Sequence, residues 1–491
     1  MNLINIILAL DNKNIYGVDG HIPWGRDISK ISGDLCHFYN TTKMRNDSKK
    51  NILIMGRLTW ESIKKPLSGR YNIVITSNYE TMQKTHSIPD TIFVKDLTTA
   101  LVFIEDKKKD LDIGNIFIIG GRKLWEEALN RKLVSNVFIS KIKDSGRYLS
   151  SENINSKMFD IYNNKIFKKH FTICKDFESI NNDLIEIHKF EYTNKEEHIF
   201  LKTIEKIINK GIFKMDRSGV GTYSLFGKSF TYDISNFRLP LFTHRKVFIR
   251  GIIEELLFFI SGNTNTKNLE KKNVNIWKGH TSREYLDKVG LTNYTEGSYG
   301  PAYGFQLRHW GAEFKGDEFD YTGKGFDQLE YIVSLLKDKN NRNSRRILFS
   351  YWNPDILDKV PLPSCHLLYN FFVDPNKEEL SVSFYQRSND YALAGVFNIV
   401  SASILTFMLC KITGLKPGKC VHNIGDLHLY SNQIEIVKEF IQNKPRYAWP
   451  FMHINNKRGD YNYTSMDDFR IEDFKTILYN SRKKYTIPFS V

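Results

Sequence analysis

The sequence predicts an α/β domain with a mostly parallel central sheet, followed by a second, larger domain. Two observations carry this prediction. The chain has 491 residues, of which 41% are hydrophobic, and this is enough for more than one substantial core. In residues 1–192, short β-rich runs alternate with amphipathic segments, an order that is typical of parallel sheets.

The elements of the first domain can be placed along the chain. Six strands are expected, at residues 3–10, 51–55, 72–76, 91–94, 115–119 and 137–142, with helical patterns between several of them. An alternating strand at 184–190 ends the domain, and an amphipathic helix at 196–208 begins the next one. We therefore expect a short junction at 193–195 and a second domain over residues 196–491.

Composition argues against several classes of protein. The five cysteines are scattered and form no C-x-x-C pair, so neither a disulfide framework nor a metal site is expected, and a cytoplasmic location fits best. The N-terminus lacks a basic signal region, and no uncharged run is expected to approach the length of a membrane span, so no membrane is expected. The net charge of +15 fits a nucleic acid, anionic small substrates or a Lys, Asn and Ile-rich bias without function, but the lysines are spread out, which disfavours nucleic acid.

Two predicted strands end in glycine before a polar or helical segment. They are I-L-I-M-G-R-L-T at 52–59 and I-F-I-I-G-G-R at 116–122. Glycine lets the backbone approach an anion, and the N–H groups that begin the following helix point toward it. Both stretches are therefore candidate phosphate-binding turns, although a Gly-Gly pair is more often an ordinary turn.

Four motifs of the first domain occur in a diagnostic order: A-L-D-N-K-N-I-Y-G-V-D-G-H-I-P-W, I-M-G-R-L-T-W-E-S-I, P-L-S-G-R-Y-N-I-V-I-T-S and F-I-I-G-G. Together they closely resemble dihydrofolate reductase. The resemblance implies that NADPH is held by Ala9, Gly17, Gly56, Arg57, Leu58, Thr59, Thr76, Ser77, Gly120, Gly121, Arg122, Lys123, Leu124 and Trp125. It implies a folate site made by Ile7, Asp34, Phe38, Leu67, Arg70 and Ile119, with Arg70 on the α-carboxylate of the glutamate tail.

The resemblance also implies one buried acid near the pterin. We favour Asp34 over Asp27, because Phe38 lies one helical turn after Asp34 on the same face and would stack on the pterin. This choice requires an insertion of roughly four residues after Trp24 relative to the family. The alternative is that Asp34 caps a helix.

Three departures from the reductase pattern lie near this site. Tyr16 replaces an isoleucine, Trp125 replaces a tyrosine, and G-R-Y-L-S at 146–150 replaces D-T-x-F-P. The family's threonine supports the buried acid, so its loss predicts a rebuilt or weakened network. An alternative function follows, in which the first domain is a scaffold with weakened catalysis.

The second domain carries a cysteine between a proline turn and an apolar strand at 367–373. In P-L-P-S-C-H, Pro361 and Pro363 fix the backbone before Cys365. The sequence also offers four arginines, at Arg217, Arg345, Arg346 and Arg387. Such a group would bind a phosphate dianion and favour a nucleophilic thiolate. Taken alone, Cys365 could equally be a half-buried structural cysteine.

Five motifs resemble thymidylate synthase from about residue 196 onward: P-L-P-S-C-H, Q-R-S-N-D, F-N-I-V-S-A-S, G-D-L-H-L-Y-S-N and R-G-I-I-E-E-L-L-F-F-I-S-G-N-T-N. The whole chain thus resembles the bifunctional dihydrofolate reductase-thymidylate synthases, and an α+β fold is implied for the second domain. The implied catalytic residues are Cys365, Glu255, Tyr303, Arg387 and Asp390, with Asp34 in the first domain. The implied dUMP site comprises Arg217, Arg345, Arg346, His366, Gln386, Arg387, Ser388, Asn389, Asp390, Asn398, His428 and Tyr430.

The resemblance assigns roles within this set. Cys365 attacks C6 of dUMP, Glu255 organises water for proton transfer, and Tyr303 is a candidate for the C5 proton step. Because Glu255 lies in the apolar helix 252–260, the alternative is a buried carboxylate whose hydrogen bonds are satisfied. Arg345 and Arg346 act from a partner subunit, which implies a homodimer. The implied folate contacts are Trp277, Asp390, Phe397 and the Val491 carboxylate of a C-terminal segment that folds over the site, with 5,10-methylenetetrahydrofolate as co-substrate.

Overall fold

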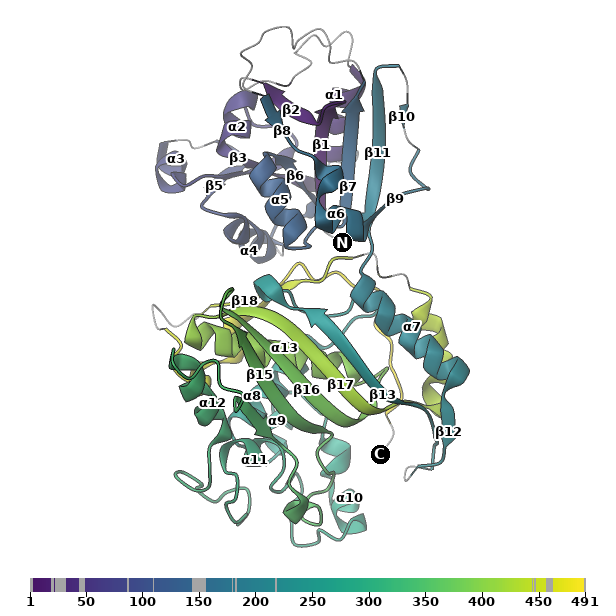
Figure 1. Cartoon of the computed structure of the whole chain (residues 1–491), viewed down its shortest axis with the longest axis vertical. Coiled ribbons are helices and arrows are strands. Elements are labelled where there is room, and N and C mark those ends of the chain that lie inside the picture. The colour runs from purple at the N-terminus through teal and green to yellow at the C-terminus, as the bar shows by residue number, and fades with distance from the viewer. Residues whose placement is uncertain are drawn as a thin grey trace. The chain divides into compact units, whose positions relative to one another are not determined.

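The computed structural model describes residues 3–18, 22, 32–43, 49–85, 88–108, 110–143, 156–178, 180–181, 183–216, 219–443, 445, 447–455 and 462–489. The chain forms two compact units (Figure 1). The first comprises residues 1–195 with 445–450 and 477–480, and the second comprises residues 196–444, 451–476 and 481–491.

The first unit is built around a nine-stranded sheet. Its strands are β1 (Ile4–Asp11), β3 (Lys50–Gly56), β4 (Arg70–Ile75), β5 (Thr91–Val94), β6 (Ile113–Gly120), β7 (Asn136–Ile142), β9 (Phe171–Ile173), β10 (Ile180–Asn181) and β11 (Ile185–Tyr192). A separate pair is formed by β2 (Ile15–Val18) and β8 (Ser156–Met158). The helices are α1 (Ser32–Thr42), α2 (Arg57–Ile63), α3 (Tyr79–Thr85), α4 (Leu97–Lys107), α5 (Arg122–Asn130) and α6 (Lys165–His170).

The strand order of this sheet is β10-β11-β7-β1-β6-β3-β4-β5, with β9 beside β11. The strands from β7 to β5 run parallel, and β11 joins β7 antiparallel. Central strands such as β1 and β3 are nearly continuous apolar runs, because helices connect parallel strands and cover both faces of such a sheet. The predicted α/β domain with a mostly parallel sheet is confirmed, and the expected strands correspond to β1, β3, β4, β5, β6, β7 and β11.

The second unit contains a six-stranded sheet in the order β12-β13-β17-β16-β15-β14. Its strands are β12 (Ile212–Lys214), β13 (Thr222–Asp233), β14 (Leu348–Ser350), β15 (His366–Asp374), β16 (Glu379–Asp390) and β17 (Lys416–Tyr430), and β18 (Phe451–Ile454) pairs separately with β19 (Phe474–Ile477). The helices are α7 (Lys195–Lys210), α8 (Ile249–Ile260), α9 (Lys267–Glu270), α10 (Arg283–Lys288), α11 (Gly304–Arg308), α12 (Gln328–Lys337), α13 (Gly395–Thr413) and α14 (Ile434–Ile441).

One connection organises this unit. All neighbours in the sheet are antiparallel except β16 and β17, which are parallel and are joined through α13. Helix α13 packs on β16 and β17 and also against α8, on the face of the sheet away from the viewer in Figure 1. The mixture of long antiparallel strands with helices on one face confirms the α+β expectation.

Helix α13 corrects one expectation from the sequence. Residues 391–410 contain no charged side chain, so an uncharged run of membrane-span length does exist. By length and composition α13 could cross a membrane, and it is the one such helix in the described part of the chain. Most of the helix is buried within the second unit, as the core helix of a globular domain would be.

The chain leaves the first unit through residues that are held in place. The N–H of Thr193 donates to the carbonyl of His170, and the N–H of Asn194 donates to the carbonyl of Pro445. Asn194 is fully buried, and Lys195 already begins α7. Backbone hydrogen bonds therefore hold residues 193 and 194, which belong to the junction expected at 193–195.

Candidate active sites

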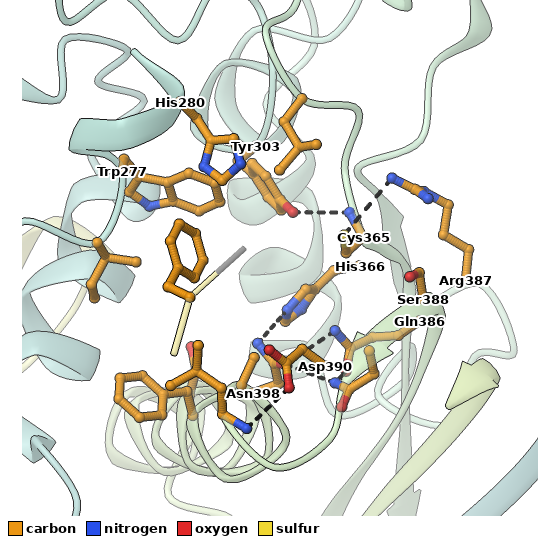
Figure 2. A pocket seen from close by; sticks show the side chains of 18 of the residues that line it. Trp277, His280, Tyr303, Cys365, His366, Gln386, Arg387, Ser388, Asp390 and Asn398 are labelled. Atoms are coloured by element: carbon orange, nitrogen blue, oxygen red, sulfur yellow. Dashed lines mark hydrogen bonds between the residues drawn. The ribbon is translucent and has the colours of Figure 1, made fainter. Parts of the chain in front are cut away.

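A cavity of about 840 Å³ lies in the second unit (Figure 2). It is bounded by α8, by the start of α13 and by the ends of the neighbouring strands β16 and β17. In Figure 2, Trp277 and His280 lie on one side of the cavity, and Asp390 and Asn398 lie on the other. Cys365 lies on the wall between them, immediately before β15.

Cys365 is held by two side chains. Its backbone N–H donates to the hydroxyl of Tyr303 at 2.9 Å, and Nη2 of Arg387 lies 3.8 Å from its Sγ. The Tyr303 backbone has φ of 39°, a value that residues with side chains seldom adopt. Burial raises the pKa of Tyr303 well above its usual value, so the hydroxyl stays protonated beside the thiol.

Arg387 also fixes the proline turn before the cysteine. Its Nε donates to the carbonyl of Ser364 at 2.9 Å, and Nη2 donates to the carbonyl of Pro363 at 2.7 Å. The guanidinium therefore locks the backbone of the turn and places its positive charge near Sγ, an arrangement that favours a thiolate.

A buried polar network lies on the floor of the cavity, below Cys365. The Asn398 amide donates to Nε2 of His366 at 2.8 Å and accepts from Gln386 at 3.2 Å and from Asn389 at 3.0 Å. Burial lowers the pKa of His366 to about 4, so its ring is neutral at pH 7 and can accept the Asn398 hydrogen bond. Amides held by one another in this way present fixed donors and acceptors to a planar polar ring.

Glu255 is the carboxylate that faces the cavity from α8. Burial raises its pKa to about 7, an effect that the indole of Trp277 partly offsets. The group can therefore gain and lose a proton near neutral pH, as a general acid or base must. The sequence left open whether Glu255 is merely a satisfied buried carboxylate, and this raised pKa favours proton transfer.

Two further carboxylates line the cavity, Asp390 at the end of β16 and Asp426 within β17. Burial raises the pKa of Asp390, whereas the nearby His428 ring and a hydrogen bond from Gln433 lower it. For Asp426 the opposite balance holds, because hydrogen bonds from His428 and Lys214 overcome burial and hold its pKa below the usual range. His428 and Tyr430 line the same end of the cavity and contact each other edge to face.

In the first unit, Asp34 lies on α1 and is buried. Burial raises its pKa, and the hydroxyl of Ser140 on β7 donates a hydrogen bond that lowers it. The changed 146–150 segment lies outside the described residues. Of the two outcomes that its change predicted, a rebuilt or a weakened network, the Ser140 contact fits a rebuilt one. The support comes instead from a strand, where Ser140 is fully buried.

The predicted folate-binding side chains gather around one apolar cluster of the first unit. Ile7 belongs to this cluster, and Phe38, Leu67 and Ile119 pack against it. Arg70 is buried at its edge, where Nη1 donates to the hydroxyl of Thr42 at 2.8 Å. The structure thus brings a hydrophobic wall, an acid and a cation together in one region, although no contact joins Asp34 to Arg70.

The two glycine turns of the first unit also meet. A side chain on Gly56 would lie 3.8 Å from the backbone of Gly121, and one on Gly120 would lie 2.9 Å from the hydroxyl of Thr59. Gly120 has φ of 153°, and Gly56 and Gly121 precede α2 and α5. This paired cradle, which a Cβ would fill, fits the phosphates of a dinucleotide.

The other predicted cofactor residues lie on several elements of the first unit. Arg57, Leu58, Lys123 and Leu124 belong to the first turns of α2 and α5, Thr76 and Ser77 follow β4, Ala9 lies on β1, and Gly17 lies on β2. Arg57 and Arg122 form exposed ion pairs with Glu61 and Glu126. Trp125 is buried, donates its indole N–H to the carbonyl of Ile118 and contacts Tyr16 edge to face.

Comparisons with known proteins cover both units. A family model described as Thymidylate synthase matches residues 198–491, and one described as Dihydrofolate reductase matches residues 3–180. A bifunctional dihydrofolate reductase-thymidylate synthase from Zea mays is 37% identical over 509 residues, which cover 97% of this chain and 94% of the relative. The chain belongs to this bifunctional family. Relatives with the same name from Leishmania amazonensis and Paramecium tetraurelia are 35% and 37% identical, and cover 98% and 99% of this chain and 93% and 98% of their own lengths.

The synthase cavity gathers most of the side chains that the sequence pointed to. Its lining includes Glu255, Trp277, Tyr303, Cys365, His366, Gln386, Arg387, Ser388, Asn389, Asp390, Phe397, Asn398, His428 and Tyr430. Arg345 and Arg346 are exposed and do not line it, and Arg217 and Val491 lie outside the described residues. Among the residues that the structure describes, no group of three or more His, Cys, Asp or Glu side chains could hold a metal ion.

The sequence missed several side chains of the synthase cavity. Lys214, His280, Asp426 and Phe489 all line it. Asp426 could have been found, because it lies two residues before His428 on an alternating strand and so shares its face. Phe489 contacts His280 edge to face at 5.4 Å, so the C-terminal segment does reach the cavity as expected. Arg245 is buried and donates to the carbonyls of Ala392 and Leu393.

Proposed function

We propose that the synthase unit converts dUMP to dTMP with 5,10-methylenetetrahydrofolate, and that the reductase unit returns the dihydrofolate product to tetrahydrofolate with NADPH. The observation that carries the proposal is a single cavity in which a cysteine beside an arginine faces a carboxylate whose pKa lies near 7. The family named above supports both activities along the whole chain, so the alternative of a weakened reductase scaffold is not favoured.

In the synthase reaction, the Cys365 thiolate adds to C6 of dUMP. Arg387 and Ser388, with Arg217, bind the phosphate, and Asn398 with its partners Gln386 and Asn389 reads the uracil ring. His428 and Tyr430 bind the 3′-hydroxyl of the sugar. These roles suit the charges and the fixed amides of the cavity.

Proton transfer would depend on Glu255 and Tyr303. Because the pKa of Glu255 is raised to about 7, its carboxyl can pass a proton through water to and from the uracil ring. The protonated hydroxyl of Tyr303 lies beside Cys365 and can take part in the C5 proton step. Trp277, Asp390 and Phe397 would contact the folate ring, and the C-terminal segment with Val491 would close over it.

In the reductase reaction, bound NADPH supplies a hydride to C6 of dihydrofolate. Asp34 favours protonation at N5 from a buried position, with Ser140 holding its carboxylate. Ile7, Phe38, Leu67 and Ile119 form the hydrophobic wall for the pterin and its linker, and Arg70 binds the α-carboxylate of the glutamate tail.

A homodimer would complete the synthase site. Arg345 and Arg346 are exposed, and strands β14, β15 and β16 expose large apolar side chains on one face of the sheet: Leu348, Leu368, Phe372 and Tyr385. An apolar face of this kind fits a two-fold contact that brings the arginine pair to the partner's phosphate site. Arg346→Ala should raise the KM for dUMP, and mixing Cys365→Ser with Arg346→Ala subunits should restore part of the activity through the one complete site of the mixed dimer.

One experiment tests both activities together. Tritium release from [5-³H]dUMP is followed in the same sample as NADPH oxidation, with methylenetetrahydrofolate as the only folate. We expect NADPH oxidation to depend on dUMP, since the synthase must first form dihydrofolate. Asp34→Asn should abolish NADPH oxidation and leave tritium release intact. If Asp34→Asn left the oxidation rate unchanged, the reductase proposal would be wrong.

A further inference from the structure

A fully buried amide joins three separate pieces of the synthase cavity. Gln433 is the last residue of the short helix η5 (Ser431–Gln433), which directly follows β17. Its Nε2 donates to Oδ2 of Asp390 at 2.7 Å and to the carbonyl of Pro488 at 2.9 Å. Its Oε1 accepts from the N–H of Tyr430 at 3.3 Å.

These contacts use both hydrogens and the oxygen of the amide. The first connects Gln433 to the end of β16, where Asp390 faces the cavity, and the second to the C-terminal segment. The third holds the amide on the backbone of Tyr430, which lines the cavity. Because buried donors and acceptors need partners, none of the three contacts can be given up without leaving a polar group unsatisfied.

The C-terminal contact leads directly into the cavity. Phe489 follows Pro488, lines the cavity and lies edge to face against His280. Asp390 is held on its other oxygen by the N–H of Leu393 at 3.2 Å, so its orientation depends on Gln433 and on one backbone group. A shift of the C-terminal segment would thus reach Asp390 through a single side chain.

We propose that Gln433 is a positioning residue that couples the seating of the C-terminal segment to the orientation of Asp390 toward the folate. This inference rests on the proposed synthase function. When Pro488 and Phe489 are in place, the Gln433 amide is held in one orientation and directs the Asp390 carboxylate into the cavity. When the segment leaves, the amide loses one partner and the carboxylate loses its fixed orientation.

The chain offers a matched control at Asn443. Its Nδ2 donates to the carbonyl of His244 at 3.1 Å and to the hydroxyl of Tyr485 at 3.0 Å. Asn443 therefore also anchors the C-terminal segment through a side-chain amide, but it forms no hydrogen bond with Asp390 and does not line the cavity. Asn443→Leu loosens the segment without touching the coupling.

The test compares Gln433→Leu, Asn443→Leu, Asp390→Asn and the double variant Gln433→Leu with Asp390→Asn. Hydrogen exchange over residues 481–489 reports the seating of the segment, and initial rates of dTMP formation give the KM for each substrate. We expect Gln433→Leu to raise the KM for methylenetetrahydrofolate about tenfold. We expect the KM for dUMP to stay within about twofold of wild type, and Asn443→Leu to raise exchange with a smaller effect on the folate KM.

The double variant decides whether Gln433 acts through Asp390. If it does, adding Gln433→Leu to Asp390→Asn changes the folate KM by less than about twofold. The inference would be overturned if the two substitutions raised the folate KM independently, so that their effects multiplied in the double variant. It would also be overturned if Gln433→Leu and Asn443→Leu gave equal folate KM values. If Gln433→Leu fails to fold, the nearly isosteric Gln433→Glu takes its place. An inactive wild-type chain would instead refute the proposed function, so the two failures remain distinct.

Discussion

The two units hold their buried acids in different ways. In the synthase unit, Glu255 faces a cavity from a helix and has only an aromatic neighbour to temper the effect of burial, which raises its pKa to about 7. In the reductase unit, Asp34 receives a hydrogen bond from the Ser140 hydroxyl of a neighbouring strand. Burial raises the pKa of both acids, but only Asp34 has a hydroxyl that stabilises its charged form. The difference teaches that the same burial can be tempered by different donors, an aromatic N–H in one unit and a hydroxyl in the other.

The largest expected effect separates the two units. Cys365→Ser removes the nucleophile and should lower dTMP formation by at least about 10³-fold. NADPH oxidation with added dihydrofolate should be unchanged, because Cys365 belongs to the synthase cavity alone. Both rates are measured on one preparation, and a parallel fall in the two would show that the active sites are not independent.

The next effect tests the acid that lacks a hydroxyl partner. Glu255→Gln should lower dTMP formation by roughly 10²–10⁴-fold. Glu254→Gln on the same helix is the control, since Glu254 pairs with Lys272 and does not line the cavity. A similar loss in both variants would assign the effect to helix α8 rather than to proton transfer.

The same substitution makes a prediction about stability and pH. The folded state holds the Glu255 proton more tightly than the unfolded state, whose carboxyl has a pKa of 4.5. The stability that this proton contributes is therefore complete below pH 4.5 and is lost as the pH rises through about 7. Glu255→Gln cannot ionise, so it should raise the free energy of unfolding by about 1–3 kcal/mol at pH 8 and change little at pH 4. Urea unfolding at the two pH values measures the difference, and a gain of equal size at both would contradict it.

A smaller effect concerns the glycine cradle of the reductase unit. Gly120→Ala would bring a Cβ to 2.9 Å from the Thr59 hydroxyl at a backbone φ of 153°. We expect a loss of about 1–3 kcal/mol in the free energy of unfolding and a weaker NADPH affinity. Gly69→Ala is the control, because Gly69 also has a positive φ. Its added Cβ would meet only the flexible side chain of Lys43, so this variant should lower the free energy of unfolding and leave NADPH affinity unchanged. Fluorescence titration with NADPH distinguishes them, and equal affinities in the two variants would argue against a phosphate cradle.

The smallest effect sharpens the comparison of the two acids. Ser140→Ala removes the hydrogen bond that lowers the pKa of Asp34, so that pKa should rise further. The pH profile of NADPH oxidation with dihydrofolate should move upward, with only a few-fold change in the maximal rate. A profile that stayed in place or moved down would mean that the hydroxyl does not act on Asp34.

Sequence reasoning succeeded where the signal was local. Both ends of the strand at 91–94 were predicted correctly, because turn residues flank this short β-rich run on each side. Contacts between distant segments could not be read in this way. Ser140 on β7 supports Asp34 on α1, and the sequence prediction missed this contact because it looked for the family's threonine in the 146–150 segment. Gln433 carries no charge and no motif role, so only the fold reveals its three partners.

The long apolar helix α13 has a consequence for the newly made chain. It lies between β16 and β17 in sequence, and it packs on both strands. At about 5–20 residues per second, β17 follows the end of α13 out of the ribosome by roughly one to three seconds. During that interval the uncharged stretch 391–410 can pack on β16 but not yet on β17. Its length and composition then match those of a membrane-spanning helix, which targeting factors bind. We therefore expect nascent chains that have released α13 from the ribosome, but not yet β17, to be the species most prone to aggregate or to be misdirected.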